Sequence, residues 1–547
     1  MTKNILRAIT PSLKNLAAAT PAKVYPLCNY NPAEVTGMLL IHNAIEKNAL
    51  ATPQKEALCI DGESVSYSQL IKLVDKLTNT LKSVGTKPGD RIGIYATIST
   101  HAIAAFIATF RCGAITAAIH RTHSQARLSQ LLKIVETKIL ITDLSDKKEP
   151  SSISDTLTAT IIIPTPSSPK DVNFCLKAGG QLIEGNLEHY EHVLPTSPAS
   201  IFFTSGSTFV PKGVLVDHKI LISVMSRIID YLKSSANDRI LTYSGLSSDY
   251  GAYNILMPLY LGGTSVIQTR QPACHSDILE VLVREKVTGM HIFPPVLYML
   301  TTSADTCQYS IPSLRYISSS GQSIYTSHLK CVRRIFPRVE IYSSYGLTEY
   351  KRVSYLDPKF VDIKPASVGK PLSGVRVYLV DDFEQLISTP GQTGELWIAG
   401  EDLMLGYWND PTANRRAFEY NKLGESRLYK SGDLFKKDED GFLYYIARKD
   451  NVFARNGWKV NPRDLEECLS SHSAVFSVLA IPLEDESAGY VPKVFVVLME
   501  NSKDTSSEEL IEHCRNHLDW HMVPVECEIV EILPHTHSGK FSPASLM

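Results

Sequence analysis

Short apolar runs alternate with longer segments of mixed polarity from about residue 36 to about residue 370. The runs at 91–95 and 138–142 enclose a helix-like segment at 101–112. Further apolar runs occur at 199–203, 264–268, 289–293, 316–318 and 340–342. Strands separated by helical segments are typical of βαβ units. The pattern therefore predicts an α/β fold with mostly parallel sheets.

The pattern of expected strands and helices changes after about residue 370. Segments 375–380 and 394–398 are typical of strands and have no long helix between them, which favours a smaller β-rich subdomain. A last part begins near Lys449 and has an α+β pattern of its own. Its expected elements are strands at 476–481 and 493–499 and a helix at 507–518. A chain of 547 residues is also too long for one core, so two or more domains are expected.

The composition argues against several classes of partner and location. The 55 lysines and arginines nearly balance the 57 aspartates and glutamates, which gives a net charge of -2. So small a net charge produces only a weak electrostatic field, which argues against nucleic acid or an anionic membrane as the main partner. No apolar run approaches the roughly 20 residues of a membrane helix. The ten cysteines include no CxxC pair, so we expect a cytoplasmic protein with reduced thiols.

Residues 204–213 read TSGSTFVPKG and directly follow an apolar run. A strand that leads into a loop of Ser, Thr and Gly presents N–H groups and hydroxyls to an anion, and Lys212 adds positive charge. Gly206 allows a backbone conformation that other residues avoid. The spacing differs from the GxxxxGK[ST] loop of kinases and GTPases. Taken alone, the stretch fits a phosphate site and a polar surface turn equally well.

Four further motifs follow in order along the chain. They are YGLTE at 345–349, GELWIAG with GYW at 394–408, YKSGD at 429–433, and LP with SGK at 533–540. Together with TSGSTFVPKG they resemble the adenylate-forming superfamily, which includes acyl-CoA synthetases, luciferase-like enzymes and nonribosomal-peptide adenylation domains. The order of five motifs makes the resemblance specific, and it covers nearly the whole chain.

The resemblance implies two half-reactions with ATP and Mg²⁺ as cofactors. A carboxylate attacks the α-phosphate of ATP, which gives an acyl-adenylate and pyrophosphate. A thiol then attacks the acyl carbon and AMP leaves. This chemistry mainly requires positioning and neutralisation of charge.

The resemblance also assigns residues to these steps. It implies that Lys540 bridges the substrate carboxylate and the α-phosphate, which Thr348 also holds. Glu349 offers a hard oxygen ligand to Mg²⁺, and Asp433 would accept both ribose hydroxyls. The other expected nucleotide-binding residues lie in the phosphate loop, beside the adenine and at the hinge. They are Thr204, Ser205, Gly206, Ser207, Thr208, Lys212, Ser320, Gly321, Tyr345 and Arg448.

The family layout implies a lead at 1–35, a large adenylation domain at 36–448 and a small mobile C-terminal domain at 449–547. The hinge falls at Arg448, and the small domain is expected to rotate there between the half-reactions. Lys540 would serve the first half-reaction, and the loop around Gly457 would face the thiol in the second.

Two positions depart from the family pattern. Phe209 stands where the family usually has glycine, so the first half-reaction is expected to be slow unless the loop adapts. Ala454 replaces a usual lysine, and Arg455 or Lys459 would have to supply that charge.

The substrate acid is expected to meet residues near 247–254. Asp249 aligns with the aspartate that amino-acid-activating members pair with the α-ammonium group, and a buried carboxylate beside a cation is a sound basis for such selection. The expected substrate is therefore an amino acid. Some acyl-activating relatives carry a similar segment without binding an amine, so a different acid stays open. The implied walls of this site are Tyr250, Tyr253, Ile292, Ser318, Ser320, Ser344, Arg352 and Val353.

These walls are more polar than a fatty-acyl tunnel would require. Arg352 is expected to pair with Asp357 or Glu349 as part of the structure, with binding of a substrate carboxylate as the alternative. No carrier domain follows Lys540 in this sequence, so the thiol is expected to arrive on a separate carrier protein. The alternatives are an acyl-CoA synthetase, which uses CoA, and a non-catalytic binding relative.

Overall fold

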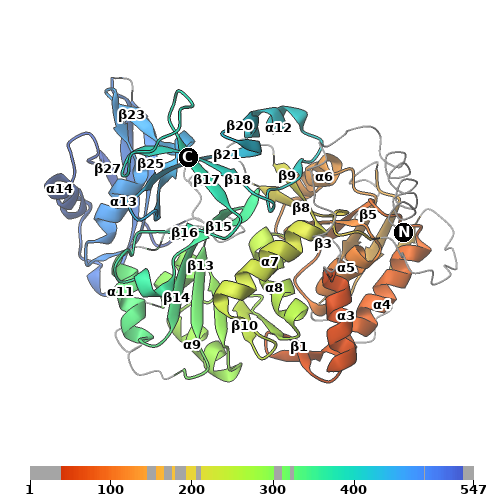
Figure 1. The fold of residues 1–547 in the computed structure, drawn as a ribbon. Helices are drawn as coiled ribbons and strands as arrows, with labels where there is room; N and C mark the ends of the chain where they lie inside the picture. Colours follow the sequence, from red (N-terminus) through yellow and green to blue (C-terminus); the bar gives the residue numbers. More distant parts are fainter. Residues whose placement is uncertain are drawn as a thin grey trace. The chain divides into compact units, whose positions relative to one another are not determined.

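The structure is a computed structural model that describes residues 39–143, 156–165, 175–178, 193–204, 211–300, 311–320, 324, 326–485 and 487–533. The expected N-terminal lead lies outside these residues. Within them the chain forms four β-sheets, which we name A to D. Sheets A and B come mainly from the region of alternating strands and helices, and C and D follow it (Figure 1).

Sheet B has the strand order β19-β9-β8-β4-β3-β5-β6-β7 in the described part of the chain. Its strands are β3 (Arg91–Tyr95), β4 (Ile115–Ala118), β5 (Ile139–Thr142), β6 (Ala159–Ile162), β7 (Cys175–Ala178), β8 (Pro198–Thr204), β9 (Lys212–Asp217) and β19 (Gly406–Tyr407). The central pairs, from β8 to β6, are parallel. β8 and β9 are antiparallel, with Thr204 opposite Lys212, so the expected phosphate loop connects two neighbouring strands.

Sheet A has the order β16-β15-β14-β13-β12-β10-β11-β1-β2. Its strands are β1 (Glu56–Ile60), β2 (Glu63–Ser66), β10 (Arg239–Thr242), β11 (Thr264–Ile267), β12 (Gly289–Ile292), β13 (Tyr316–Ser320), β14 (Glu340–Leu347), β15 (Tyr350–Tyr355) and β16 (Lys370–Pro371). The pairs from β1–β11 through β13–β14 are parallel, whereas β14–β15 is antiparallel. The predicted βαβ units are therefore confirmed, with antiparallel strands added at the sheet edges.

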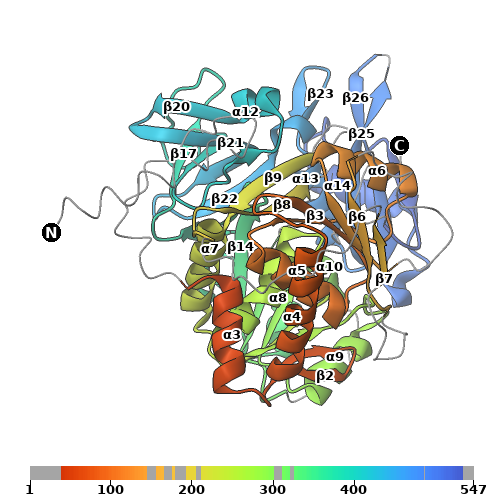
Figure 2. The same ribbon diagram turned by 90° about the vertical axis from the view of Figure 1, so that its right-hand side faces the viewer.

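Helices fill the connections between these strands. They are α3 (Ile41–Ala51), α4 (Tyr67–Ser83), α5 (Thr100–Arg111), α6 (Gln125–Ile134), α7 (His218–Leu232), α8 (Asp249–Leu261), α9 (His275–Arg284), α10 (Pro294–Met299), α11 (Thr326–Ile335), α12 (Pro411–Ala417), α13 (Pro462–Ser470) and α14 (Ser507–His517). α3, α4 and α5 lie side by side (Figures 1 and 2). α4 begins with a capping box, in which Ser66 Oγ accepts a hydrogen bond from the Gln69 N–H and the Gln69 side chain accepts one from Ser66 N.

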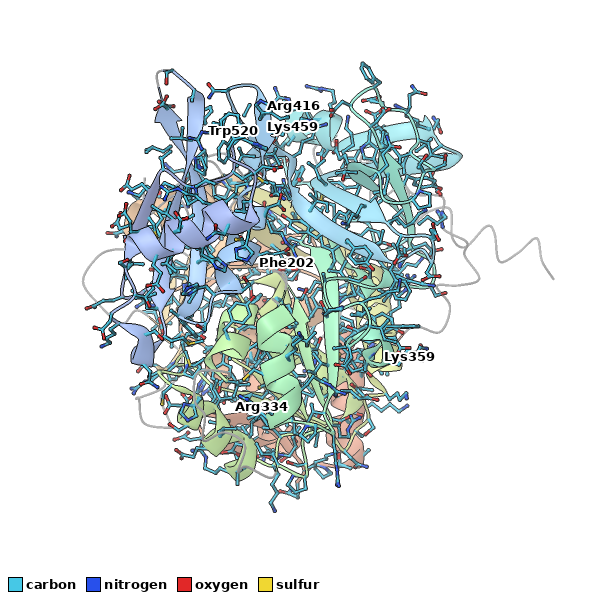
Figure 3. All side chains as sticks on the ribbon, turned by 90° about the vertical axis from the view of Figure 1, so that its left-hand side faces the viewer. Phe202, Arg334, Lys359, Arg416, Lys459 and Trp520 are labelled. Carbon is cyan, nitrogen blue, oxygen red and sulfur yellow. The ribbon has the colours of Figure 1, made fainter. Side chains whose placement is uncertain are left out.

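The two faces of sheet A differ in character because side chains alternate along each strand. Leu241, Met290 and Ile317 pack with apolar residues of α9 and α11 in one core. The other face meets α7 and α8, and there the Tyr231 ring of α7 lies 5.6 Å from the Tyr342 ring of β14. α8 also reaches sheet B, since Tyr253 lies 6.5 Å from the Phe202 ring of β8. α7 and α8 thus lie between the two sheets (Figure 1), and Phe202 is in the interior (Figure 3).

Sheet C is the expected β-rich subdomain. Its strands are β17 (Arg376–Val380), β18 (Thr393–Ala399), β20 (Phe418–Lys422), β21 (Glu425–Lys437) and β22 (Leu443–Arg448). All of these pairs are antiparallel. Trp397 is buried here in a small core with Val380 and Leu428.

Sheet D belongs to the last part of the chain. Its strands are β23 (Phe453–Arg455), β24 (Trp458–Val460), β25 (Val475–Asp485), β26 (Gly489–Leu498) and β27 (Glu526–Ile529). α13 and α14 bury Leu465 and Leu510 against Val494 and its neighbours in a separate core. This α+β arrangement was expected, so the predicted fold class is confirmed. No helix in the described ranges is long and apolar enough to cross a membrane.

Candidate active site

Tyr345, Asp433 and Arg448 meet although they come from three separate sequence motifs. The Tyr345 hydroxyl donates a 2.5 Å hydrogen bond to Oδ2 of Asp433, and Nη1 of Arg448 donates one of 3.1 Å to Oδ1. Asp433 and Arg448 stand opposite each other on β21 and β22, so the strand register fixes their contact. The structure therefore brings the predicted ribose ligand together with the predicted adenine-side tyrosine and the hinge arginine.

The surroundings hold these groups in defined protonation states. Burial, followed by the charge of Asp433, raises the pKa of Tyr345, so its hydroxyl remains a donor. Burial alone would lower the pKa of Arg448, but the Asp433 carboxylate outweighs it and raises that pKa. The Tyr345 ring also packs edge-on against Phe435, with centroids 4.7 Å apart. Tyr345 is thus a core residue whose polar end faces the site.

Two motif glycines are explained by local geometry. A Cβ on Gly346 of YGLTE would lie 2.0 Å from the backbone oxygen of Lys351, which no side chain can tolerate. Gly432 of YKSGD has φ +70, a conformation that favours glycine. Both glycines directly neighbour residues of the cluster described above.

A second cluster forms around Glu349. The Tyr407 hydroxyl donates a 2.8 Å hydrogen bond to Oε1 of Glu349 and lies 3.3 Å from the hydroxyl of Tyr429. Nζ of Lys212 lies 5.1 Å from the centre of the Tyr407 ring. β19, which carries Tyr407, pairs with β9, which begins at Lys212. The exit of the phosphate loop therefore lies next to the predicted metal ligand.

Burial raises the pKa of Glu349, although the hydrogen bond from Tyr407 opposes this effect. Among the described residues, Glu349 makes no ion pair. A carboxylate that is desolvated and lacks a contacting cation fits a hard divalent cation such as Mg²⁺. The sequence assigned no role to Tyr407 and Tyr429, although their positions in GYW and YKSGD were a usable signal.

The other predicted nucleotide-binding residues are only partly described. Thr204 ends β8 and Thr348 lies in the turn after β14, and both are half-buried. Ser320 ends β13 opposite Ser344 of β14. The predicted residues outside the described ranges are Ser205, Gly206, Ser207, Thr208, Gly321 and Lys540. Their roles remain predictions.

Asp249 has a partner that the sequence did not reveal. Nζ of Lys351 donates a 2.9 Å hydrogen bond to Oδ2 of Asp249, and the side chains are only 8% and 17% exposed. The same ammonium lies 4.7 Å from the Tyr250 ring centre and 5.5 Å from that of Tyr253. A lysine of the chain itself thus takes the position predicted for a substrate ammonium group.

The other predicted acid-contacting residues divide between the two faces of sheet A: Ser318 and Ser344 share the α7 and α8 face with Tyr342, whereas the Ile292 side chain belongs to the core on the α9 and α11 face. The Tyr250 hydroxyl donates to the backbone oxygens of Ile292 and Ser318, at 3.2 and 3.4 Å. Ser344 Oγ donates to the backbone oxygen of Ser319 at 3.1 Å. Tyr250, Ile292, Ser318, Ser344 and Val353 are all buried. His291, which the sequence reading missed, lies opposite Ser318 in the register.

Arg352 does not make the ion pair expected from the sequence. Asp357 pairs with Lys359, and Glu349 accepts its hydrogen bond from Tyr407. Arg352 is 2% exposed, and its Nη1 donates to Ser344 Oγ. Its Nε has no hydrogen-bond partner in the structure. The expectation that Arg352 pairs with Asp357 or Glu349 was therefore wrong, because the Arg352 side chain extends to Ser344 and forms no ion pair with either carboxylate.

Comparison with known proteins agrees with the motifs. Residues 45–408 match the AMP-binding enzyme family, and residues 464–540 match the AMP-binding enzyme C-terminal domain. A linear gramicidin synthase of Brevibacillus parabrevis is 27% identical over 93% of this chain, which spans only 6% of that protein. The L-proline–[L-prolyl-carrier protein] ligase of Streptomyces coelicolor is 25% identical, over 88% of this chain and 91% of its own length.

Solved structures show the same fold. The o-succinylbenzoate CoA synthetase of Bacillus subtilis, in complex with an acyl-adenylate, is 25% identical, with a TM-score of 0.75 over 92% of this chain and 97% of its own. The same enzyme in complex with ATP and magnesium ion gives a TM-score of 0.76 at 25% identity, over 91% of this chain and 98% of its own. With the motif clusters in place and the family match covering most of its length, the chain belongs to the AMP-binding enzyme family of adenylate-forming ligases.

Proposed function

We propose that the protein uses ATP and Mg²⁺ to activate a small carboxylic acid as an acyl-adenylate, and then transfers the acyl group to the phosphopantetheine thiol of a separate carrier protein. The observation that carries the proposal is the meeting of distant motifs in two clusters. Asp433 joins Tyr345 to Arg448, and Tyr407 joins Glu349 to Lys212. Such convergence is expected where one ligand is held from several sides.

Asp433 suits the ribose. Its carboxylate is buried and is oriented by the hydrogen bonds from Tyr345 and Arg448, and a carboxylate is a strong acceptor for hydroxyl groups. Glu349 would hold Mg²⁺, which neutralises charge on the triphosphate when bound. Lys212 and Thr348 would hold phosphate oxygens beside it, and Lys540 would bind the oxygen on which charge builds during attack.

The domain layout remains part of the proposal. We place the boundary at 448/449, where β22 ends and a short turn at Lys449–Asn451 leads to sheet D. Nζ of Lys449 lies 3.3 Å from carboxylate oxygens of both Glu395 and Asp382, and the lysine itself is exposed. The pair with Asp382 is exposed and therefore weak, so it can exchange during a hinge rotation at little cost, whereas Glu395 is largely buried.

The amino-acid hypothesis is weakened by Lys351. An α-ammonium group would have to displace an internal ammonium from Asp249, at a site where both charges are largely removed from water. The Asp249–Lys351 pair therefore favours an acid without an α-amino group. An amino acid remains the alternative that the experiment below must test.

Exposed aromatic residues on the small domain support a protein acceptor. Trp458 and Trp520 are 58% and 57% exposed, and each lies within 6 Å of the His521 ring. Figure 3 shows Trp520 and Lys459 at the periphery of this domain. A hollow of about 660 Å³ beside Trp520 is lined in part by Arg455 and Arg515. Aromatic and arginine side chains are enriched at protein interfaces.

The decisive measurement of the first half-reaction is acid-dependent exchange of pyrophosphate into ATP. We expect exchange with at least one class of small carboxylic acid, and loss of most of it in Asp433→Ala and Lys540→Ala. Exchange should also stop when Mg²⁺ is chelated. A purified, folded protein that shows no exchange with amino, aliphatic or aryl acids would contradict the proposal and favour a non-catalytic relative.

The acceptor needs a separate assay with the activated acid. We expect acyl transfer to a phosphopantetheinylated carrier protein to fall in Trp520→Ala while pyrophosphate exchange is unchanged. Tyr420→Ala is the matched control, because Tyr420 is also an exposed aromatic residue but lies on sheet C. Efficient transfer to CoA, with no dependence on Trp520, would instead support an acyl-CoA ligase, the activity for which the Bacillus subtilis structure is named.

A further inference from the structure

Arg352 is a buried cation without a described anionic partner. Its side chain comes from β15 and is 2% exposed, and no carboxylate of the described residues forms an ion pair with it. Its Nη1 meets the neutral hydroxyl of Ser344, and its Nε is unpaired. A buried charge is costly unless an opposite charge or several hydrogen bonds compensate it. A partner that the described protein does not supply is therefore expected.

The described surroundings of Arg352 supply no negative charge that would compensate it. Lys351 directly precedes it in the chain, and Asp249 neutralises the Lys351 ammonium. His291 faces the same region, and burial, followed by the charges of Arg352 and Lys351, lowers its pKa to about 3. His291 is therefore neutral, and its Nδ1 makes no hydrogen bond. The described groups thus leave one positive charge, that of Arg352, uncompensated.

This charge lies on the face of sheet A where the acid is expected to bind. Arg352 contacts Ser344, the residue directly before Tyr345, and Tyr345 belongs to the proposed nucleotide cluster. Tyr250 of α8 is on the same side, since its hydroxyl bonds to Ile292 and Ser318. Arg352 is three residues from Glu349, on the strand that follows it. A group bound by Arg352 would therefore be near the reacting carboxylate but distinct from it.

We infer that the substrate acid carries a second carboxylate, which Arg352 binds while the first is adenylated. This inference rests on the proposed function and names its substrate class as a dicarboxylic acid. A guanidinium can donate two parallel hydrogen bonds to a carboxylate. In Arg352, Nε has no partner and would be one of the two donors, with a terminal nitrogen of the same guanidinium as the other. The hydroxyl of Ser344 and the unpaired Nδ1 of His291 are further polar atoms on this side.

The test uses the full-length wild-type protein and compares acids that differ only in the group at the far end from the reacting carboxylate. Pyrophosphate exchange is measured with succinate against butyrate and with glutarate against pentanoate. Because a site built for a polar group strongly rejects analogues that lack it, we expect kcat/KM to favour the dicarboxylate by roughly 10²–10⁴-fold. Equal or better exchange with the monocarboxylates would overturn the inference but leave the proposed function intact. No exchange with any acid would overturn both.

Variants then assign the effect to Arg352. Arg352→Gln is expected to lose most of the preference for the dicarboxylate, mainly through a higher KM for that acid, and Arg352→Lys should retain part of it. Arg334→Gln is the charge-matched control, since Arg334 is exposed on α11 (Figure 3). Retention of the full preference in a folded Arg352→Gln protein would overturn the inference. If that variant does not fold, the wild-type comparison and Arg352→Lys still decide it.

Discussion

The ion pair between Lys351 and Asp249 allows a quantitative test of the acid-binding site. Its nitrogen and oxygen are 2.9 Å apart, and both side chains are mostly buried. At an effective dielectric constant of about 20, this distance gives a gross attraction of about 6 kcal/mol, against about 1 kcal/mol in bulk water. Desolvation of the two groups cancels part of the attraction, so the net contribution must be measured with a double-mutant cycle.

We expect Lys351→Met to lower the free energy of unfolding by about 3 kcal/mol, since it removes the ammonium that faces a largely buried carboxylate. Asp249→Asn should lower the free energy of unfolding by a similar amount, because it removes the carboxylate that faces the largely buried Lys351 ammonium. The loss in the double variant should be smaller than the sum of the two single losses by about 2 kcal/mol, and this difference is the coupling energy of the pair. Urea unfolding of the four proteins, followed by intrinsic fluorescence, gives the three differences.

The exposed pair Lys359–Asp357 provides the matched control. Its nitrogen–oxygen distance is also 2.9 Å, but its side chains are 66% and 40% exposed. The cycle of Lys359→Met with Asp357→Asn should give a coupling energy below about 1 kcal/mol, as is usual for surface pairs. If the Lys351–Asp249 coupling were equally small, the pair would not be a buried interaction, and the argument that Lys351 excludes an α-ammonium group would fail.

Three other changes test the proposed nucleotide site and the phosphate loop. Tyr345→Phe removes one hydrogen bond to Asp433 and should raise the KM for ATP about tenfold with little change in kcat; a loss confined to kcat would contradict this role. Gly346→Ala should abolish exchange and lower the unfolding temperature because its Cβ would overlap a strand carbonyl, whereas Gly245→Ala, which meets open space, should do neither. Phe209→Gly should speed adenylation, as seen in the rate of pyrophosphate exchange, if the bulky residue hinders the phosphate loop. An unchanged or lower rate would mean that the loop has adapted to Phe209.

The sequence predicted the strands of the parallel sheets well. The run at 91–95 is β3 without any change of boundary, because a strand buried on both faces reads as a continuous apolar run. β14 was predicted only at 340–342 but extends to Leu347. Its second half carries Ser343, Ser344 and the Tyr-Gly-Leu part of YGLTE, and the two serines and the glycine interrupt the apolar run that would reveal a strand. The polar residues that line a binding face therefore shorten the apparent strands.

The motifs predicted which residues belong to the nucleotide site, but they could not show how those residues contact one another. The hydrogen bond between Tyr345 and Asp433 joins residues 88 positions apart, and that between Lys351 and Asp249 joins residues 102 apart. No local pattern records such pairings, because they depend on the relative positions of sheets A and C and of α8. The misassignment of Arg352 has the same origin, since its sequence neighbours Asp357 and Glu349 offered the nearest carboxylates along the chain.

The geometry of β15 explains why the directions of the Lys351 and Arg352 side chains are difficult to predict from the sequence. In a regular strand, the neighbours Lys351 and Arg352 would point to opposite faces of the sheet. The pairing of β14 with β15 shifts register between Tyr345 and Leu347, and such irregularities break the alternation of side chains. Lys351 accordingly pairs with Asp249 of α8, and Arg352 donates to Ser344, which shares the α7 and α8 face of sheet A with Tyr342. Because the shift lies within YGLTE, the turn that carries Glu349, the proposed metal ligand, also sets the direction of Arg352. The proposed acid and nucleotide sites therefore share one short segment, and we expect a substitution that regularised β15 to impair acid preference and pyrophosphate exchange together.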